Sequence, residues 1–354
     1  MWIENNIFKE DLEYINSVEF LDWKKLDNKT LFVTGATGLI GYYLTNALLY
    51  RNLKFNSNIK IIALVRNTDK ARSMFKEQIK VNSSICFVNG DVEQLPEIDG
   101  DIDYIVHGAS PTDSSFFVER PVETIKIAVQ GTINVLELAK KKRSQGLVYL
   151  SSMEVYGAPH IECLISETQG TTLDTMSVRS CYPEAKRICE SLCASYASEY
   201  GVPANVIRLA QTFGPGVHLD DNRVFAEFAR CAIQNNDIVL QTLGTSKRCY
   251  LYNADAITAI LAVLLSNRTG EAFNAANHKT YCSIVEMANI VAKEIGKNGI
   301  DVCVTTDGKH EQKFSPPHLL KLDSSKIEKL GWKATRNLKE MYERMIEGYS
   351  IKEM

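Results

Sequence analysis

The chain has 354 residues, of which 45% are hydrophobic and 23% are charged, and its net charge is −3 at pH 7. This length and composition are typical of one large or two fused globular α/β domains and exclude a disordered or fibrous chain. Because there is no basic surplus, nothing in the composition supports binding to nucleic acid.

The first residues carry acidic side chains and no long apolar run, so they do not resemble a secretory signal. No stretch approaches the roughly 18 consecutive apolar residues of a membrane-spanning helix. The nine cysteines form no CxxC pair, which favours reduced thiols. We therefore expect a cytoplasmic protein that does not contact the membrane.

Residues 1–28 read as an amphipathic lead-in, and from 29 to 210 short apolar runs alternate with helical segments. Helices of this length between strands form right-handed βαβ units, so the sequence predicts a Rossmann-like, doubly wound parallel sheet. The predicted strands are 31–34, 60–65, 85–88, 104–106, 146–150 and 205–209, and the main predicted helices are 39–50, 122–142 and 183–200.

The alternation ends after residue 210. Gly214, Pro215 and Gly216 interrupt the chain, and the remainder mixes helices with short strands. We expect residues 29–210 to bind a dinucleotide and residues 211–354 to form a smaller mixed substrate-binding domain. This smaller domain would cover the carboxyl edge of the sheet, interleaved with it at its edges.

A glycine-rich turn with GxxGxxG spacing follows the first predicted strand and opens the first long helix, at residues 35–41. Gly35 permits the tight turn, Gly38 lets backbone N–H groups approach a pyrophosphate, and Gly41 lets helix and strand pack closely. The N-terminus of a helix also carries partial positive charge. The turn therefore predicts a nicotinamide dinucleotide as cofactor.

The ends of the following strands supply further cofactor contacts. Arg66 stands where an Asp or Glu would favour NAD, and its guanidinium could pair with a 2′-phosphate. NAD and NADP both stay open, with a lean toward NADP. Asp91 is placed to accept a hydrogen bond from the adenine amine. The expected cofactor-binding residues are Gly35, Thr37, Gly38, Leu39, Ile40, Gly41, Arg66, Asn67, Asp91, Val92, Ala109, Ser110, Tyr182, Lys186 and Leu209.

Tyr182 and Lys186 form a YxxxK motif. Pro183 suits the first position of a helix, so the two side chains share one helix face. A nearby ammonium favours phenolate, and we expect it to lower the pKa of Tyr182 enough for a base near neutral pH. Ser152 can hydrogen-bond the same substrate hydroxyl, whereas Ser151 is interpreted as no more than its neighbour in the strand.

Three segments together resemble the extended short-chain dehydrogenase/reductase family, among the NAD-dependent epimerases and dehydratases that modify nucleotide sugars. They are TGATGLIG at 34–41, SMEVYG at 152–157 and YPEAK at 182–186, within a resemblance that runs from about residue 29 to 345. Three other segments are most similar to UDP-glucuronate decarboxylases: HGASP at 107–111, RSCYPEAKR at 179–187 and HLDDNRV at 218–224.

The resemblance implies roles for particular residues. Ser152, Tyr182 and Lys186 would form the catalytic oxidation triad, and Glu154 matches an extra catalytic carboxylate of decarboxylases and 4,6-dehydratases. Basic residues would hold the diphosphate or nearby sugar atoms, and Gln211 stands where the family usually has Asn. The substrate-binding residues implied are Ser110, Ser152, Glu154, Gln211, Arg223 and Arg248.

The activity implied is a transient oxidation of a nucleotide-diphosphate sugar at C4, with UDP-glucuronate decarboxylation as the leading hypothesis. Alternatives are a 4,6-dehydratase, a 4-epimerase, an NADP-dependent keto-sugar reductase and, outside enzymes, an NAD(P)-sensing binding protein. Met153 occupies the place of a proton-donating Asp in 4,6-dehydratases, which argues against the standard dehydratase mechanism.

Some residues are given structural interpretations. His107 is expected to be packed rather than a base, and Trp332 is expected in the core. His160, His218 and His278 lack ligand spacing, so no metal is proposed. The family forms homodimers through helices equivalent to 122–142 and 183–200. Ile188, Cys189 and Leu192 could therefore face a partner, although burial against the chain's own sheet would give the same pattern.

Overall fold

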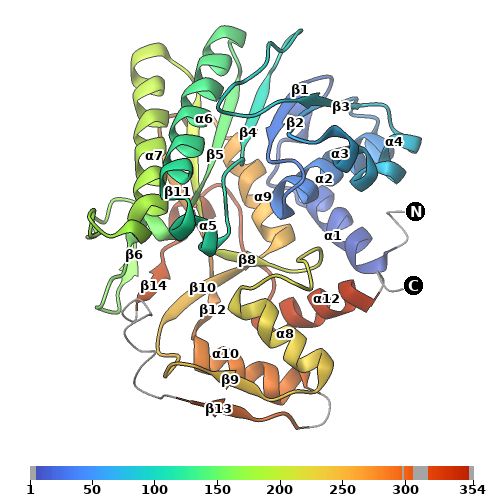
Figure 1. Ribbon diagram of the computed structural model, residues 1–354. Helices are drawn as coiled ribbons and strands as arrows, with labels where there is room; N and C mark the ends of the chain where they lie inside the picture. The colour runs from blue at the N-terminus through green and yellow to red at the C-terminus, as the bar shows by residue number, and fades with distance from the viewer. Residues whose placement is uncertain (1–4, 297–298, 306–317, 351–354) are drawn as a thin grey trace.

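The computed structural model describes residues 5–296, 299–305 and 318–350. Its centre is a seven-stranded parallel sheet in the order β11-β7-β5-β4-β1-β2-β3 (Figure 1). The predicted doubly wound sheet and its six strands are confirmed, and β11 adds a seventh. The strands are β1 (Thr30–Thr34), β2 (Lys60–Val65), β3 (Ile85–Asn89), β4 (Tyr104–His107), β5 (Gly146–Ser152), β7 (Ala204–Leu209) and β11 (Ala272–Ala275).

Helices cover both faces of this sheet. The helices α2 (Leu39–Phe55) and α9 (Asn253–Leu264) lie on one face, and α6 (Pro121–Lys142) and α7 (Cys181–Tyr200) lie side by side on the other (Figure 1). The central strands read as continuous apolar runs because both of their faces are buried. The parallel connections bring all carboxyl ends of the strands to one edge.

The N-terminal segment packs against the rest of the chain. Helix α1 (Asn6–Ser17) contacts α2, α9 and the C-terminal helix α12 (Leu338–Ser350). The buried Asp11 carboxylate forms an ion pair with Arg344 of α12 at 2.8 Å and accepts a hydrogen bond from the Tyr252 hydroxyl at 2.7 Å. Burial raises the pKa of Asp11 to about 6. The two ends of the chain are therefore joined through the core.

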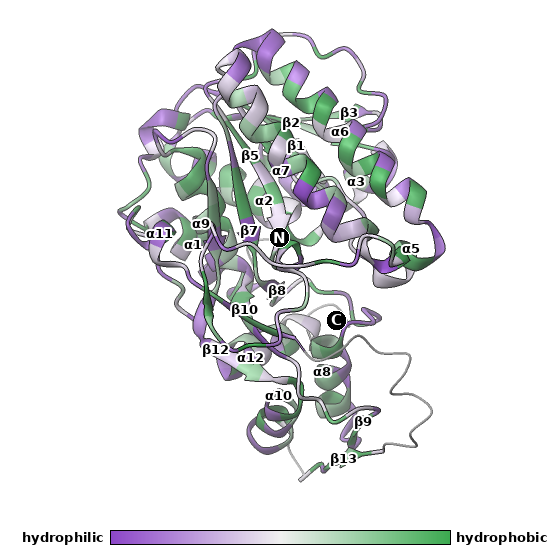
Figure 2. Cartoon of the chain, turned by 90° about the vertical axis from the view of Figure 1, so that its left-hand side faces the viewer, coloured by the Kyte–Doolittle hydropathy of each residue, from purple (hydrophilic) through white to green (hydrophobic). Residues whose placement is uncertain are grey.

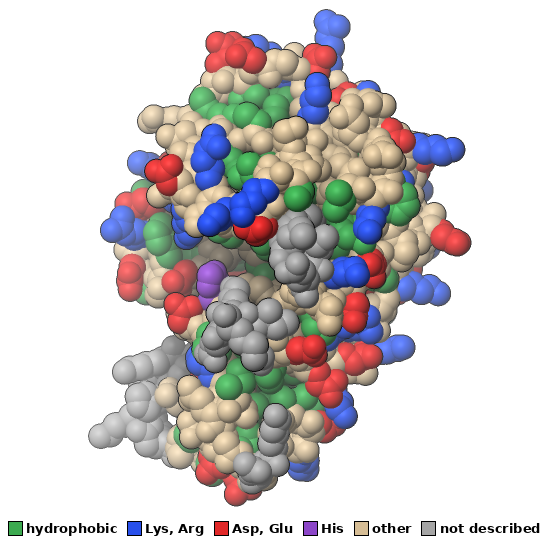
Figure 3. Space-filling model, turned by 90° about the vertical axis from the view of Figure 1, so that its right-hand side faces the viewer, with side chains coloured by type: hydrophobic (Ala, Val, Ile, Leu, Met, Phe, Trp, Pro, Cys, Tyr) green, Lys and Arg blue, Asp and Glu red, His purple; other side chains and the backbone are tan. Residues whose placement is uncertain are grey.

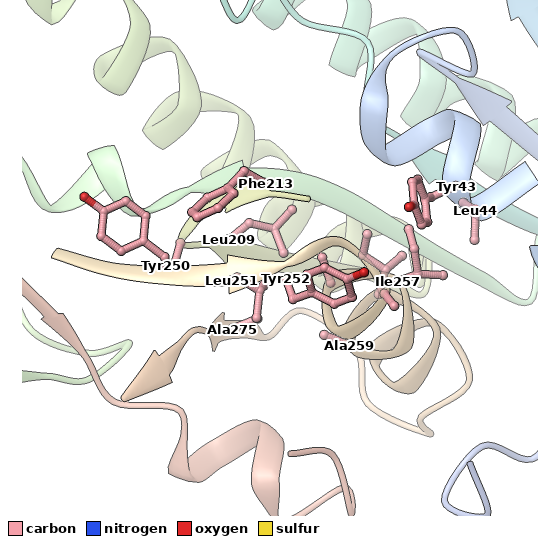
Figure 4. Packing of buried hydrophobic residues seen from close by; sticks show 14 of the residues in the cluster. Tyr43, Leu44, Leu209, Phe213, Tyr250, Leu251, Tyr252, Ile257, Ala259 and Ala275 are labelled. Atoms are coloured by element: carbon pink, nitrogen blue, oxygen red, sulfur yellow. The ribbon is translucent and has the colours of Figure 1, made fainter. Parts of the chain in front are cut away.

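The C-terminal part is built on a second sheet, in the order β12-β10-β14-β6, with β8 also paired to β10. A buried aromatic and aliphatic cluster runs from α2 and α9 to β8 and β10, so the two parts share one hydrophobic core (Figure 4). Trp332 is buried in this cluster, as expected. The strands are β6 (Leu164–Ile165), β8 (Gln211–Phe213), β10 (Lys247–Tyr252), β12 (Asn277–Ser283) and β14 (Leu319–Leu322).

A two-stranded sheet of β9 and β13 and several short helices complete the chain. No helix among the described residues is long and apolar enough to cross a membrane. On the face shown in Figure 3, acidic and basic side chains are interspersed. The remaining strands and α-helices are β9 (Ile238–Leu240), β13 (Val302–Val304), α3 (Thr68–Met74), α4 (Lys76–Val81), α5 (Ser114–Glu119), α8 (Val224–Gln234), α10 (Ile284–Ile290) and α11 (Ser325–Glu328). There are also short 3-10 helices, η2 (Trp23–Leu26), η3 (Met153–Tyr156) and η4 (Val178–Ser180), and a one-turn π-helix, η5 (Val291–Ile295).

Candidate active site

The glycine-rich turn connects β1 to α2 and has no room for side chains at two of its glycines. Gly35 has φ +75°, and a Cβ there would lie 2.9 Å from the Gly108 carbonyl carbon. A Cβ on Gly41 would lie 2.2 Å from the Gly35 oxygen. Gly38 caps α2 and directs the helix N-terminus toward the carboxyl edge of the sheet. This backbone cradle fits the pyrophosphate of a dinucleotide.

Thr34 and His107 fasten this turn to the end of β4. The Thr34 hydroxyl oxygen accepts hydrogen bonds from the N–H groups of Gly108 and Ala109, both at 3.1 Å. Its distance to Nδ1 of His107 is 2.7 Å, and Nε2 of that imidazole lies 3.2 Å from the Thr132 hydroxyl. His107 is therefore a packed structural residue, as expected.

A cavity of about 1410 Å³ opens beside the turn at the carboxyl ends of the strands. Single-ligand pockets typically measure roughly 300–1,000 Å³, so this cavity has room for a dinucleotide and a second ligand. All the predicted site residues line it except Asn67, whose side chain caps α3 instead. The Ser110 hydroxyl is buried in the cavity lining, and among the described residues it has no hydrogen-bond partner. Such an orphaned polar atom fits a site that is completed by a ligand.

The carboxyl end of β5 presents two candidate catalytic side chains to the cavity. The Ser152 hydroxyl oxygen accepts a hydrogen bond from the Glu154 N–H at 3.2 Å and so starts the turn η3. The Glu154 carboxylate accepts a hydrogen bond from the Arg179 guanidinium at 2.8 Å, and each side chain is 36% exposed. Met153, between the two, is buried and cannot transfer a proton.

Helix α7 carries the other two candidates. It begins at Cys181, so the expectation that Pro183 takes the first helical position is wrong by two residues. Proline is tolerated there because N–H groups of the first turn lack helical partners. The Tyr182 ring stacks on Phe117 of α5 at 4.3 Å between centroids. The Lys186 ammonium donates to the Leu150 carbonyl at 2.7 Å.

The prediction that the pKa of Tyr182 is lowered is wrong, because the net shift in the structure is upward. Burial raises the pKa of the phenol, and the negative charge of Glu154 raises it further. Hydrogen bonding to Ser152 and the positive charge of Arg179 act in the opposite direction, but their effects are smaller. Burial also lowers the pKa of Lys186 to about 8, which weakens the ammonium as a source of positive charge.

The two arginines expected to hold a diphosphate differ in their surroundings. Arg223 forms a two-point ion pair with Asp221, with N–O distances of 2.6 and 3.0 Å, which neutralises much of its charge. Arg248 instead donates to the Gln211 side-chain oxygen at 3.3 Å and lies 2.8 Å from Nε2 of His318. Within the part of the chain that the structure describes, its buried Nε has no hydrogen-bond partner. Arg248 is therefore the better placed of the two to bind an anion.

Several residues around the cavity were not predicted to take part. The sequence shows Arg179 only as part of a motif and does not single out Phe117 or His318. The contacts of these residues join distant segments, so their spacing in the chain carries no signal. The sequence also gives no sign of the largely buried ion pair between Arg208 and Glu190, although Glu190 lies one helical turn after Lys186.

The fold and the cavity together define an NAD-dependent enzyme whose cavity, at the carboxyl ends of the strands, is lined by a serine, a tyrosine and a lysine. The model of the NAD dependent epimerase/dehydratase family matches residues 31–276. The chain belongs to this family. Among the described residues, no group of three or more His, Cys, Asp or Glu side chains could hold a metal ion.

Curated relatives bear out the finer resemblance. The chain is 29% identical to UDP-glucuronic acid decarboxylase 1 of Xenopus tropicalis over 91% of its length and 72% of the relative. It is also 29% identical to UDP-glucuronic acid decarboxylase 6 of Arabidopsis thaliana, over 92% of its own length and 90% of that relative. The fold matches the UDP-glucuronic acid 4-epimerase of Bacillus cereus, solved with UDP-glucuronic acid and NAD, with TM-score 0.72 and 21% identity over 91% of this chain and 99% of that one.

Proposed function

We propose that this enzyme decarboxylates UDP-glucuronate through a transient 4-keto sugar. The observation that carries the proposal is the convergence of Ser152, Glu154, Tyr182 and Lys186 on the cavity that begins at the glycine-rich turn. The decarboxylases among the relatives support the choice of reaction.

In this proposal Tyr182 takes the proton of the sugar 4-hydroxyl, which Ser152 holds by a hydrogen bond. Lys186 stabilises the phenolate form of Tyr182 that accepts this proton, and it helps to orient the cofactor. The bound nicotinamide supplies the hydride acceptor and, in its oxidised form, a positive charge. The 4-keto sugar with a carboxylate on C5 is a β-keto acid, so the C5–C6 bond breaks and its electron pair moves into an enolate. CO₂ leaves, C5 gains a proton, and return of the hydride and of the Tyr182 proton restores the alcohol.

The ion pair at the cavity wall suits a sugar with a carboxylate. Glu154 alone would repel an anionic substituent, whereas Arg179 beside it can offer N–H donors to that substituent. We propose that Arg179 divides its donors between Glu154 and the substrate carboxylate. Met153 weighs against a 4,6-dehydratase because it offers no proton for a leaving hydroxyl group.

We further propose that Arg248 binds the diphosphate, with Gln211 and His318 orienting its guanidinium, and that Arg223 and Ser110 make additional contacts. Arg66 lines the cavity beyond β2 and is exposed. An exposed guanidinium at this position can meet a 2′-phosphate, so we propose that the enzyme accepts NADP as well as NAD.

We propose a homodimer formed through α6 and α7. These helices face the viewer side by side in Figure 2, and exposed apolar side chains, Val122 and Ile125 of α6 and Ile188 of α7, lie on them. Cys189 is fully buried within the chain itself, so of the two alternatives left open for it, burial holds and contact with a partner does not. Light scattering of Ile188→Asp, compared with the wild type, tests the dimer.

All nine cysteines are free thiols in the structure, which fits the proposed cytoplasmic location.

The proposed reaction is tested by incubating the enzyme with UDP-, CDP-, GDP- and dTDP-sugars and reading the products by mass spectrometry. The proposal predicts that UDP-glucuronate loses CO₂. Loss of water from another sugar would favour a dehydratase, and an unchanged mass with inverted C4 would favour an epimerase.

A further inference from the structure

A largely buried ionic cluster lies behind the candidate catalytic residues. Arg208 of β7 donates to both carboxylate oxygens of Glu190 of α7, at 3.0 Å to Oε1 from Nε and at 2.6 Å to Oε2 from Nη2. The two side chains are only 13% and 11% exposed. The Ser151 hydroxyl of β5 donates to the same carboxylate at 2.5 Å. We call Ser151, Glu190 and Arg208 the anchor cluster.

The anchor cluster joins the three segments that carry the candidate catalytic residues. Ser151 directly precedes Ser152, and Glu190 lies one helical turn after Lys186. Arg208 stands opposite Ser151 in the register of β5 and β7, and its Nη1 also donates to the Tyr156 hydroxyl at 2.7 Å. Tyr156 belongs to η3, the turn that carries Glu154.

A second hydrogen bond between β5 and α7 fixes the orientation of the helix relative to the strand. Leu150 precedes Ser151 in β5, and its carbonyl accepts from the Lys186 ammonium at 2.7 Å. Adjacent residues of one strand therefore hold two side chains that lie one turn apart on α7. One bond would leave the helix free to pivot about it, whereas two such bonds fix both its distance from the strand and its rotation.

We propose that the anchor cluster is a positioning device that holds Ser152, Glu154, Tyr182 and Lys186 in their reactive arrangement and keeps negative charge near Lys186. A buried ion pair is weak evidence for stability, because desolvation offsets much of its attraction. We infer that this ion pair fixes the orientation of α7, because apolar side chains would fill the same space without fixing the angle of the helix. The inference rests on the proposed function only for its kinetic readout.

The charge of Glu190 acts on Lys186 against burial. Burial lowers the pKa of Lys186 to about 8, and the Glu190 carboxylate raises it. The other titratable groups around this ammonium are Cys189 and Cys193 of α7, Tyr182 of the same helix, Tyr149 of β5 and His107 of β4. Removing the charge at position 190 therefore shifts the pKa of Lys186 further down.

The test compares Ser151→Ala and Glu190→Gln with the wild type. The control is Glu137→Gln, which removes a carboxylate that also contacts α7, through Tyr196, but lies outside the cluster. We expect kcat to fall about tenfold in Ser151→Ala and about a hundredfold in Glu190→Gln, because displacements near 1 Å can cost about 10² in rate. KM should stay within about twofold, and the control should behave as the wild type.

The pH profile separates positioning from stability. Loss of the Lys186 proton ends activity on the alkaline side, so this limb of the kcat profile should move to lower pH in Glu190→Gln and stay in place in the control. Because Glu190→Gln leaves the Arg208 guanidinium without its carboxylate, folding of each variant is first checked by thermal unfolding. Ser151→Ala keeps the ion pair and is the decisive variant.

Hydrogen–deuterium exchange reads the coupling without substrate. Residues 150–156 and 181–187 should exchange faster in Ser151→Ala and Glu190→Gln than in the control. If the wild type converts no nucleotide sugar, the proposed function fails while this readout still tests the cluster. Wild-type kcat and wild-type exchange in a folded Ser151→Ala variant would overturn the inference, whatever the stability of Glu190→Gln.

Discussion

His107 should make the protein sensitive to acid, and the structure gives the size of the effect. The Thr34 hydroxyl oxygen accepts hydrogen bonds from the N–H groups of Gly108 and Ala109. Its own hydrogen is therefore directed to Nδ1 of His107. The Thr132 hydroxyl donates to the Ala128 carbonyl and can accept from Nε2. The imidazole is therefore held neutral, with its proton on Nε2, and a second proton has no acceptor.

Burial and, to a smaller extent, the positive charge of Lys186 together lower the pKa of His107 from 6.5 to about 3. Between these values the unfolded chain binds a proton that the folded chain does not. The contribution of the neutral His107 to the free energy of unfolding is therefore fully present above pH 6.5 and is lost as the pH decreases toward 3. At about 1.4 kcal/mol per pH unit, acidification from pH 7 to pH 4 costs about 3 kcal/mol through this one residue.

Urea unfolding of the wild type and of His107→Gln at pH 7, 5.5 and 4 measures this contribution. The variant should be less stable at pH 7 because it loses the fitted imidazole, but its stability should fall less on acidification, by about 3 kcal/mol. The exposed His218→Gln serves as control and should keep the wild-type dependence. Equal acid dependence in His107→Gln and wild type would refute the assignment of a neutral, trapped imidazole.

Three further variants test the cofactor and substrate sites. Gly41→Ala should abolish NAD(P) binding in a fluorescence titration and lower the melting temperature, because its Cβ would meet the Gly35 oxygen at 2.2 Å; normal binding would contradict the cradle. Arg66→Ala should weaken NADP binding about tenfold and leave NAD binding unchanged, the loss expected for one charge-assisted hydrogen bond of about 1.5–3 kcal/mol. Arg179→Met should raise KM for UDP-glucuronate about tenfold or more, by the same reasoning, but not the Kd for UDP-xylose, which lacks the carboxylate. Arg268→Met, which removes an exposed arginine outside the cavity, is its control, and an equal effect of Arg179→Met on both ligands would mean that Arg179 does not contact the carboxylate.

The nucleotide-binding sheet was predictable from sequence because local patterns determine it. Strands such as β1 and β4 are covered on both faces and therefore appear as unbroken apolar runs. The glycine spacing at 35–41 is likewise a local signal. In contrast, β11 has four residues and finds its partner β7 more than 60 residues away in the chain, so no periodicity marks it.

The site was only partly predictable, for the same reason. Tyr182 and Lys186 lie one turn apart on one helix, and that spacing is visible in the sequence. The interpretation of Ser151 as a mere neighbour of Ser152 is wrong, because its hydroxyl binds Glu190 across 39 positions of sequence. The predicted direction of the Tyr182 pKa shift is wrong, because burial, which the sequence does not show, raises this pKa by more than the nearby positive charges lower it.

In the proposed reaction Tyr182 starts the decarboxylation as the base for oxidation of the sugar at C4, and the bound nicotinamide would be the hydride acceptor. The most direct measurement supplies UDP-glucuronate labelled with ¹³C at the carboxyl carbon to the wild type and to Tyr182→Phe, and follows labelled CO₂ and the UDP-pentose formed. The account predicts release of the label by the wild type and a loss of at least about 10² in rate in the variant, the contribution of one general base. Labelled CO₂ released equally fast without the phenol, or none released by a wild type that binds the substrate, would contradict it.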